Sequence, residues 1–306
     1  MSAFFDKDSD TTITSMPDEQ QRSLRNRLLV FVALVVVGTA IAGGLAIAKV
    51  IPIGYAVLVG VTTITLMLWS HASTLIGTKS ATMMFITGIV MGFVFEDFSV
   101  HFNVGGGYYF QPILGPKIDV IPLVIPQFWV ISIYMCWVMM NFILDGAPTP
   151  RINTPFRILE RALAADLIMT TVDLSADPVA VHIIGAWVWK KPGTYFGVPY
   201  ANYTFIWFLV GVLTLVVHGF QERKEVKTWI DTAHYGLRIW TILPVLAYGG
   251  NWLMMMLINY DGAIGLLAGF SMGGPFVIAL VKWIDWYRAT SPKALAKKAV
   301  AEKANA

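Results

Sequence analysis

The sequence is poor in charge. Only 13% of its 306 residues are Asp, Glu, Lys or Arg, whereas 56% are hydrophobic. About a quarter of the residues of a soluble domain are usually charged, so the composition argues against an ordinary soluble enzyme. The net charge of +3 at pH 7 is also too small to predict binding to nucleic acid.

Residues that support redox or metal chemistry are scarce as well. Cys136 is the single cysteine and lies in an apolar run, so a buried core position is expected and no intramolecular disulfide can form. The histidines do not form the boxes that a membrane di-iron oxygenase needs, and no metal site of known spacing is present. Glycines 105–107 follow a predicted helix rather than a strand, which argues against a nucleotide loop. We therefore expect no metal and no cofactor, and acid–base chemistry by carboxylates or no chemistry.

Long apolar segments take the place of these features, and they predict an all-α, polytopic transmembrane helix bundle. Crossing a hydrocarbon core requires roughly 20 mainly apolar residues. About eight helices are expected, near residues 28–48, 52–70, 81–98, 122–144, 155–176, 202–219, 237–259 and 263–286. This gives a polar arm over 1–27, a transmembrane domain over 28–288 and a basic tail over 289–306.

The basic residues predict the orientation of these helices. If the N-terminus lies inside, the outer segments hold only Lys49, Lys117, Lys190 and Lys191, and the other Lys and Arg residues lie on the inner side. This asymmetry agrees with the positive-inside rule for an even number of spans. We therefore expect both termini to be cytoplasmic.

Two carboxylates end one of the predicted helices on the outer side. Glu96 and Asp97 follow an apolar run, where carboxylates are costly and usually functional or paired. The alternative is that the helix leaves the hydrocarbon before them and both are solvated. His101 lies close to this pair, although a lone histidine near a membrane surface is more often structural than a ligand.

The fifth predicted helix carries a polar stripe. Asp166, Thr170, Asp173 and Asp177 are spaced i, i+4, i+7 and i+11, which places them on one side of a helix. The stripe faces either a polar interior cavity or the neighbouring arginines and loop backbone. Aromatic residues cluster farther along the chain, and they form either a membrane-interface belt or a slot for a flat apolar substrate.

Several stretches, taken together and in order, resemble the carotenoid-biosynthesis membrane protein family, which contains acyclic carotenoid hydratases of the bacterioruberin and myxol type. The resemblance covers roughly residues 85–220. It is carried by Leu114-Gly115-Pro116-Lys117, Val120-Ile121-Pro122-Leu123-Val124-Ile125-Pro126, Phe128-Trp129, Asp173-Leu174 with Asp177-Pro178, Gly185-Ala186-Trp187-Val188-Trp189, and Tyr195-Phe196-Gly197-Val198-Pro199 followed by Asn202.

The resemblance implies cofactor-independent hydration of a terminal double bond of an acyclic, lycopene-like carotenoid, giving a tertiary alcohol. Such a reaction needs a neutral carboxylic acid, a carboxylate that deprotonates water, and aromatic faces or negative charge beside the cation. We expect one of Glu96 or Asp97 to pair with one of Asp173 or Asp177. The remaining expected site residues are Asp119 and His101, which would orient water, and Tyr109, Trp187, Tyr195 and Asn202, which would contact the substrate.

This interpretation implies a bacterial inner (cytoplasmic) membrane, contact with the lipid bilayer and membrane enzymes of the same pathway as partners. The high aromatic content suits a non-catalytic carotenoid-binding or assembly subunit equally well. The spacing of Asp173 and Asp177 is also that of membrane prenyltransferases, which use such aspartates to hold magnesium diphosphate, but the second aspartate-rich motif of those enzymes is missing.

Overall fold

The computed structural model describes residues 18–150, 154–203, 206–225, 237–258, 261–291, 293–294, 297 and 300–301. The predicted N-terminal arm lies outside these residues up to position 17, and the predicted tail is described only in part. The division of the chain into an arm, a membrane domain and a tail therefore stays a prediction.

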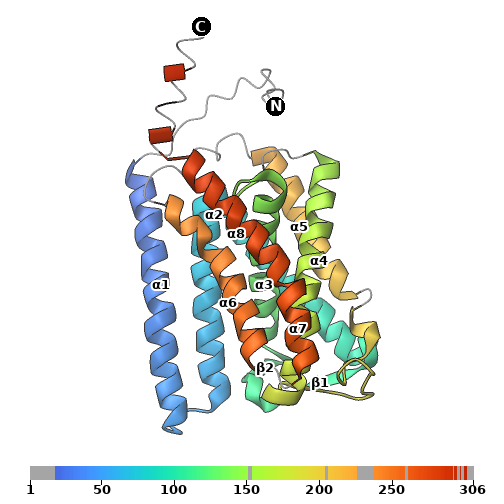
Figure 1. Ribbon diagram of the computed structural model, residues 1–306. Coiled ribbons are helices and arrows are strands. Elements are labelled where there is room, and N and C mark those ends of the chain that lie inside the picture. Colours follow the sequence, from blue (N-terminus) through green and yellow to red (C-terminus); the bar gives the residue numbers. More distant parts are fainter. Residues whose placement is uncertain are drawn as a thin grey trace.

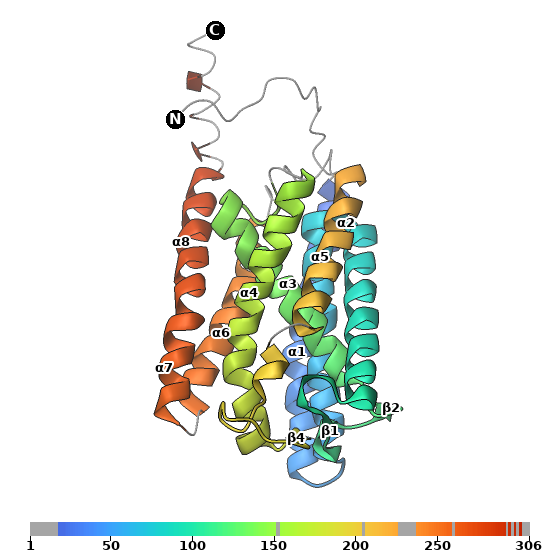
Figure 2. The same cartoon turned by 90° about the vertical axis from the view of Figure 1, so that its right-hand side faces the viewer.

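The described chain forms one bundle of helices that run alongside each other (Figures 1 and 2). The helices are α1 (Asp18–Ile47), α2 (Ile53–Phe102), α3 (Val124–Asp145), α4 (Pro155–Val179), α5 (Ile206–Glu225), α6 (Leu243–Ile258), α7 (Gly262–Ser271) and α8 (Gly273–Ala289). Among the described residues, six helical segments are long and apolar enough to cross a membrane. The predicted all-α, polytopic fold is confirmed.

Helix α2 passes through the bundle twice. A straight helix of its 50 residues would be about 75 Å long, more than twice a hydrocarbon core of roughly 30 Å. The backbone breaks at Gly77, with φ 79° and ψ 154°, a conformation that glycine adopts without steric cost. Ile53 and Glu96, near opposite ends of α2, line the same cavity, so the chain reverses between them. The two predicted helices near 52–70 and 81–98 are these two passes.

Two other boundaries differ from the expectation. Helix α1 begins at Asp18, within the predicted arm, because an apolar run marks only the hydrocarbon part of a helix and not its polar extension. The predicted helix over 263–286 is divided into α7 and α8 at Met272. With α2 counted twice and α7 and α8 as one pass, α1 starts and α8 ends at the same end of the bundle (Figure 1).

Short strands lie at the other end of the bundle, in the segment that joins α2 to α3 and in the segment that joins α4 to α5. Strand β1 (Tyr108–Phe110) pairs antiparallel with β4 (Trp187–Trp189), with Tyr108 opposite Trp189 and Phe110 opposite Trp187. Strand β2 (Lys117–Ile118) pairs with β3 (Ile121–Pro122) in a second small sheet. The sequence did not predict these strands, because segments of two or three residues show no alternating pattern.

The core is centred on α3, which contributes the buried Tyr134, Phe142 and, as expected, Cys136. The fully buried His71 of α2 joins three segments. Its Nδ1 lies 2.6 Å from the Tyr134 hydroxyl, and its Nε2 lies 2.9 Å from the carbonyl oxygen of Trp240. Trp240 belongs to a 3₁₀ turn, η6 (Arg238–Ile242), that precedes α6.

We expect His71→Ala to destabilise the bundle, because the buried Tyr134 hydroxyl and Trp240 carbonyl would lose their partner. Each unsatisfied group costs about 1–3 kcal/mol. Thermal unfolding in detergent measures the loss. His101→Ala, whose ring is half exposed at the bundle end, is the control. Equal melting temperatures of the two variants would contradict this role of His71.

Candidate functional site

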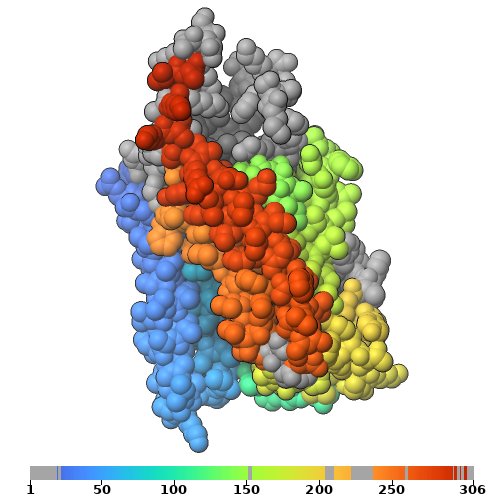
Figure 3. All heavy atoms as spheres, in the orientation of Figure 1, coloured from blue at the N-terminus to red at the C-terminus, as the bar shows by residue number. Residues whose placement is uncertain are grey.

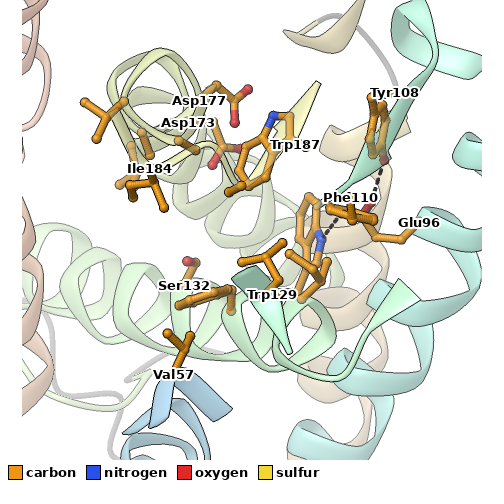
Figure 4. Close-up of a pocket in the computed structure, with 18 of the residues that line it drawn as sticks. Val57, Glu96, Tyr108, Phe110, Trp129, Ser132, Asp173, Asp177, Ile184 and Trp187 are labelled. Atoms are coloured by element: carbon orange, nitrogen blue, oxygen red, sulfur yellow. Dashed lines mark hydrogen bonds between the residues drawn. The ribbon is translucent and has the colours of Figure 1, made fainter. Parts of the chain in front are cut away.

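A cavity of about 510 Å³ lies at the end of the bundle that carries the strands, a volume typical of small-molecule sites. Its walls come from α2, α3, α4 and α6, from β1 and β4, and from the loops that join them (Figure 4). Most of the lining is apolar. The polar side chains among its lining residues are Glu96, Tyr108, Ser132, Asp173, Asp177, Asn202 and Asn251, together with the indoles of Trp129, Trp187 and Trp189.

Glu96, near the end of α2, is buried and fixed by two hydrogen bonds (Figure 4). The hydroxyl of Tyr108 donates to Oε2 at 2.5 Å, and the indole Nε1 of Trp129 donates to Oε1 at 2.8 Å. Burial, and after it the nearby Glu96 carboxylate, raises the pKa of Tyr108 well above its usual range. Tyr108 therefore keeps its proton and remains a donor. Since each oxygen of Glu96 accepts a hydrogen bond, the arrangement suits an ionised carboxylate.

Asp173 and Asp177 lie one turn apart on α4, on the wall opposite Glu96 (Figure 4). Asn202 donates from Nδ2 to Oδ2 of Asp177 at 2.5 Å. The hydroxyl of Tyr203 lies beside the same carboxyl, and burial followed by the charge of Asp177 raises the pKa of Tyr203 above its usual range. Asp173, in contrast, receives no hydrogen bond from any described residue. Both aspartates are close enough to Glu96 for their charges to interact.

The pairing of β1 with β4 places aromatic rings at the end of the cavity. Opposite residues of an antiparallel pair have neighbouring side chains on one face of the sheet. Tyr108 accordingly packs edge-to-face on Trp189, with ring centroids 4.9 Å apart, and Phe110 lies 6.1 Å from Trp187. All four line the cavity. The alternation along the strand turns Tyr109 outward, where it is exposed.

Five of the expected site residues meet in the cavity, namely Glu96, Asp173, Asp177, Trp187 and Asn202. Tyr195 is not among the lining residues. Its hydroxyl donates to the carbonyl oxygen of Leu174 at 2.7 Å, and its ring packs on Tyr203 with centroids 5.5 Å apart. Tyr195 therefore supports the wall of the cavity from behind.

Asp97, His101 and Asp119 form a separate cluster on the exposed surface and do not line the cavity. The ring of His101 has Nδ1 3.5 Å from Asp97 and Nε2 3.3 Å from Asp119. The possible ligand atoms lie within 4.8 Å of one another. Nδ1 lies closer still, at 2.9 Å, to the backbone carbonyl oxygen of Asp97, so the imidazole is held by a hydrogen bond within its own helix.

The polar stripe of α4 divides into two parts. Asp173 and Asp177, nearer the end of α4, line the cavity. Asp166 is buried against Gly211 of α5, and a side chain at position 211 would collide with its carboxyl group. Within the described residues, neither carboxylate oxygen of Asp166 has a hydrogen-bond partner. Arg161, nearer the start of α4, forms an ion pair with Asp145 at 2.7 Å.

Sequence reasoning missed Tyr108, Trp129 and Asn251 as lining residues. Asn251 had a usable signal, since an amide within the apolar helix α6 is unusual. The sequence predicted Tyr109 instead of Tyr108, because only the strand pairing decides which of two adjacent side chains faces inward. Trp129 gave no signal that separates it from an interface tryptophan.

Comparisons with known proteins identify a family that includes this site. A protein-family model described as "Carotenoid biosynthesis protein" matches residues 53–278, which include all the lining residues of the cavity. No curated protein and no solved structure matches the chain.

We expect Tyr108→Phe to lower the free energy of unfolding by about 1.5–3 kcal/mol, the usual contribution of a hydrogen bond to a charged group. The matched control is Tyr109→Phe, in the adjacent exposed position, which should be neutral. Thermal unfolding of both variants in the same detergent decides the matter. A loss for Tyr109→Phe as large as that for Tyr108→Phe would be inconsistent with a buried Tyr108–Glu96 bond.

Proposed function

Because the chain belongs to the carotenoid biosynthesis protein family, we propose that it is a hydratase that adds water to a terminal double bond of an acyclic, lycopene-like carotenoid. One observation carries the proposal: three carboxyl groups in two different environments converge with aromatic faces in one apolar cavity. An apolar cavity suits a hydrocarbon substrate, and paired carboxyl groups are what acid–base addition of water requires. No cofactor is needed for this chemistry.

Asp173 is the general acid of the proposed reaction. It lines the cavity and receives no hydrogen bond from the described residues, so its surroundings favour the neutral carboxyl over the anion. Its proton is transferred to the less substituted alkene carbon, and the π electrons form the new C–H bond. The tertiary carbon is left with the positive charge.

Glu96 is the general base. Its two hydrogen bonds stabilise the carboxylate form. A water molecule attacks the tertiary cation and forms the C–O bond, and its proton passes to Glu96. The products are a tertiary alcohol and an enzyme whose proton has moved from Asp173 to Glu96. Exchange with water returns the proton and completes the cycle without a net change.

The cation between these steps needs stabilisation in a site with few polar groups. The indole faces of Trp129 and Trp187 border the cavity and would attract it by cation–π interaction. Asp177, oriented by Asn202, lies one turn from Asp173 and would present the oxygens of its carboxyl group to the cation. In this proposal Asp177 tunes the cation site, and Asp97, His101 and Asp119 take no direct part.

The setting of the proposed enzyme follows from its helices. We propose that it is a multi-pass protein of the bacterial inner membrane. The start of α1 and the end of α8 would both lie on the cytoplasmic side. The cavity would then open on the outer half of the membrane. Membrane enzymes that make or consume acyclic carotenoids are the partners this location favours.

The first test is expression in a lycopene-accumulating bacterial host, with pigments analysed by chromatography and mass spectrometry. The wild type should add one water for each modified end. Asp173→Asn and Glu96→Gln should reduce product at least about 100-fold, because general acid–base catalysis contributes roughly 10²–10⁴. Asp173→Asn is the cleaner variant, since no described residue hydrogen-bonds to Asp173.

Matched controls are Asp97→Asn, next to Glu96 on α2, and Asp119→Asn in the loop, both outside the cavity. They should keep nearly full activity at equal protein levels in the membrane. Loss of product in these variants but not in Asp173→Asn would refute the assignment of the site. If lycopene and several more desaturated acyclic carotenoids all stay unchanged while pigment co-purifies in stoichiometric amount, the protein is a carotenoid-binding subunit and not a hydratase.

A further inference from the structure

The most exposed of the residues that line the cavity are all apolar. Four lining residues are strongly exposed: Ile53 of α2 (51%), Phe128 of α3 (42%), Ile184 after α4 (47%) and Met254 of α6 (44%). Every polar lining residue is buried or half-buried. An opening that faced water would be expected to carry polar groups at its rim. We call these four residues the apolar mouth.

Among the described residues, the β1–β4 pair lines the cavity at the end of the bundle. Tyr108, Phe110, Ala186 and Trp189 of the β1–β4 pair and its approach are buried, as is Leu114 in the loop that follows β1. Their backbone hydrogen bonds join the two segments, including one from Gln111 N–H to the carbonyl oxygen of Ala186 at 2.8 Å. The strand pair therefore covers the cavity on the side of the aqueous phase.

The surroundings of the mouth are those of a lipid-facing surface. On α6, Met254 is flanked by exposed Leu246, Leu253 and Leu257. Figure 3 shows this part of α6 on the surface of the bundle, between α1 and α7. Exposed large apolar residues above and below the mouth are expected where a helix contacts hydrocarbon and not water.

The cavity is also short along the helices that form the mouth. Its lining residues run from Ile125 to Ser132 on α3, from Asn251 to Met255 on α6 and from Met169 to Val179 on α4. At 1.5 Å per residue these stretches span about 10 Å, about 6 Å and about 15 Å. A long conjugated chain is stiff and cannot coil into such a space. Only one end of it can reach the carboxyl groups while the remainder leaves through the mouth.

We propose that the apolar mouth is a lateral portal, through which a stiff polyene chain enters end-first from the bilayer. The reacting end lies between Asp173 and Glu96, and the unreacted part stays in the lipid. The identity of the ligand as a polyene rests on the proposed hydratase function. The portal does not depend on that function, because an apolar chain can enter through it whether or not the chain then reacts.

Blocking the portal tests the idea by binding as well as by reaction. Met254→Trp should fill the mouth, and Leu253→Trp, the neighbouring residue of the same helix with 51% exposure outside the cavity, is the matched control. Lycopene retained by the purified protein in lipid nanodiscs should fall about 10-fold in Met254→Trp and stay unchanged in Leu253→Trp. Size-exclusion profiles verify that both variants fold.

Retention in Met254→Trp equal to that in Leu253→Trp would overturn the portal. Water addition measured in the same samples separates the two proposals. Loss of lycopene from Met254→Trp supports the portal, and the hydratase is refuted separately if the wild type forms no hydrated product from lycopene or from several more desaturated acyclic carotenoids.

Chain length supplies an independent measurement. Acyclic polyenes that share the end group but differ in length should compete for the site with affinities within a few-fold of each other, because the remainder of each chain lies in lipid. A steep dependence of affinity on length would mean that the whole chain is enclosed, and the portal would be refuted.

Discussion

The hydrogen bonds to Glu96 are the contacts on which the rest of this site depends. A carboxylate among apolar helices is costly unless its oxygens are satisfied, and here the two donors come from different elements, Tyr108 on β1 and Trp129 on α3. Satisfying Glu96 therefore brings a polar connecting segment against the end of a helix. Because β1 is held at the end of α2, its pairing with β4 places the segment between α4 and α5 over the cavity as well. The covered cavity therefore depends on one buried carboxyl group.

The same cavity keeps its carboxyl groups in unequal surroundings. Glu96 accepts two hydrogen bonds and Asp177 accepts one from Asn202, while no described residue donates to Asp173. Residues of one chemical type thus differ in how many hydrogen bonds they accept, and the proposed division into an acid and a base rests on that difference. The family match indicates carotenoid biosynthesis for the chain. The unequal hydrogen bonding of the three carboxyl groups, together with the apolar lining, supports the specific reaction proposed above.

The fold could be predicted from the sequence because hydrocarbon imposes a length and a composition on every spanning helix. That constraint does not act on the connections. The two apolar runs predicted a reversal of the chain between residues 70 and 81, but neither its position at Gly77 nor the β1–β4 pairing could be anticipated. The same limit applies to the site. Asp173 and Asp177 could be placed on one side of a helix from their spacing alone. Choosing Glu96 over Asp97, or Tyr108 over Tyr109, requires knowing which neighbour packs on each side, and that depends on contacts between residues far apart in the chain.

Helix α1 stands apart from all of this. It packs mainly against α2, contributes no residue to the cavity and lies outside the stretch that matches the family. Arg27 attaches it to the first pass of α2 by lying over the ring of Trp69, 4.7 Å from the ring centroid. Substitutions in α1 and substitutions in the helices that line the cavity therefore have different consequences. Substitutions along the lipid-facing side of α1 leave the geometry of the cavity untouched, so this helix can diverge between relatives while the passes behind it are held to a common shape.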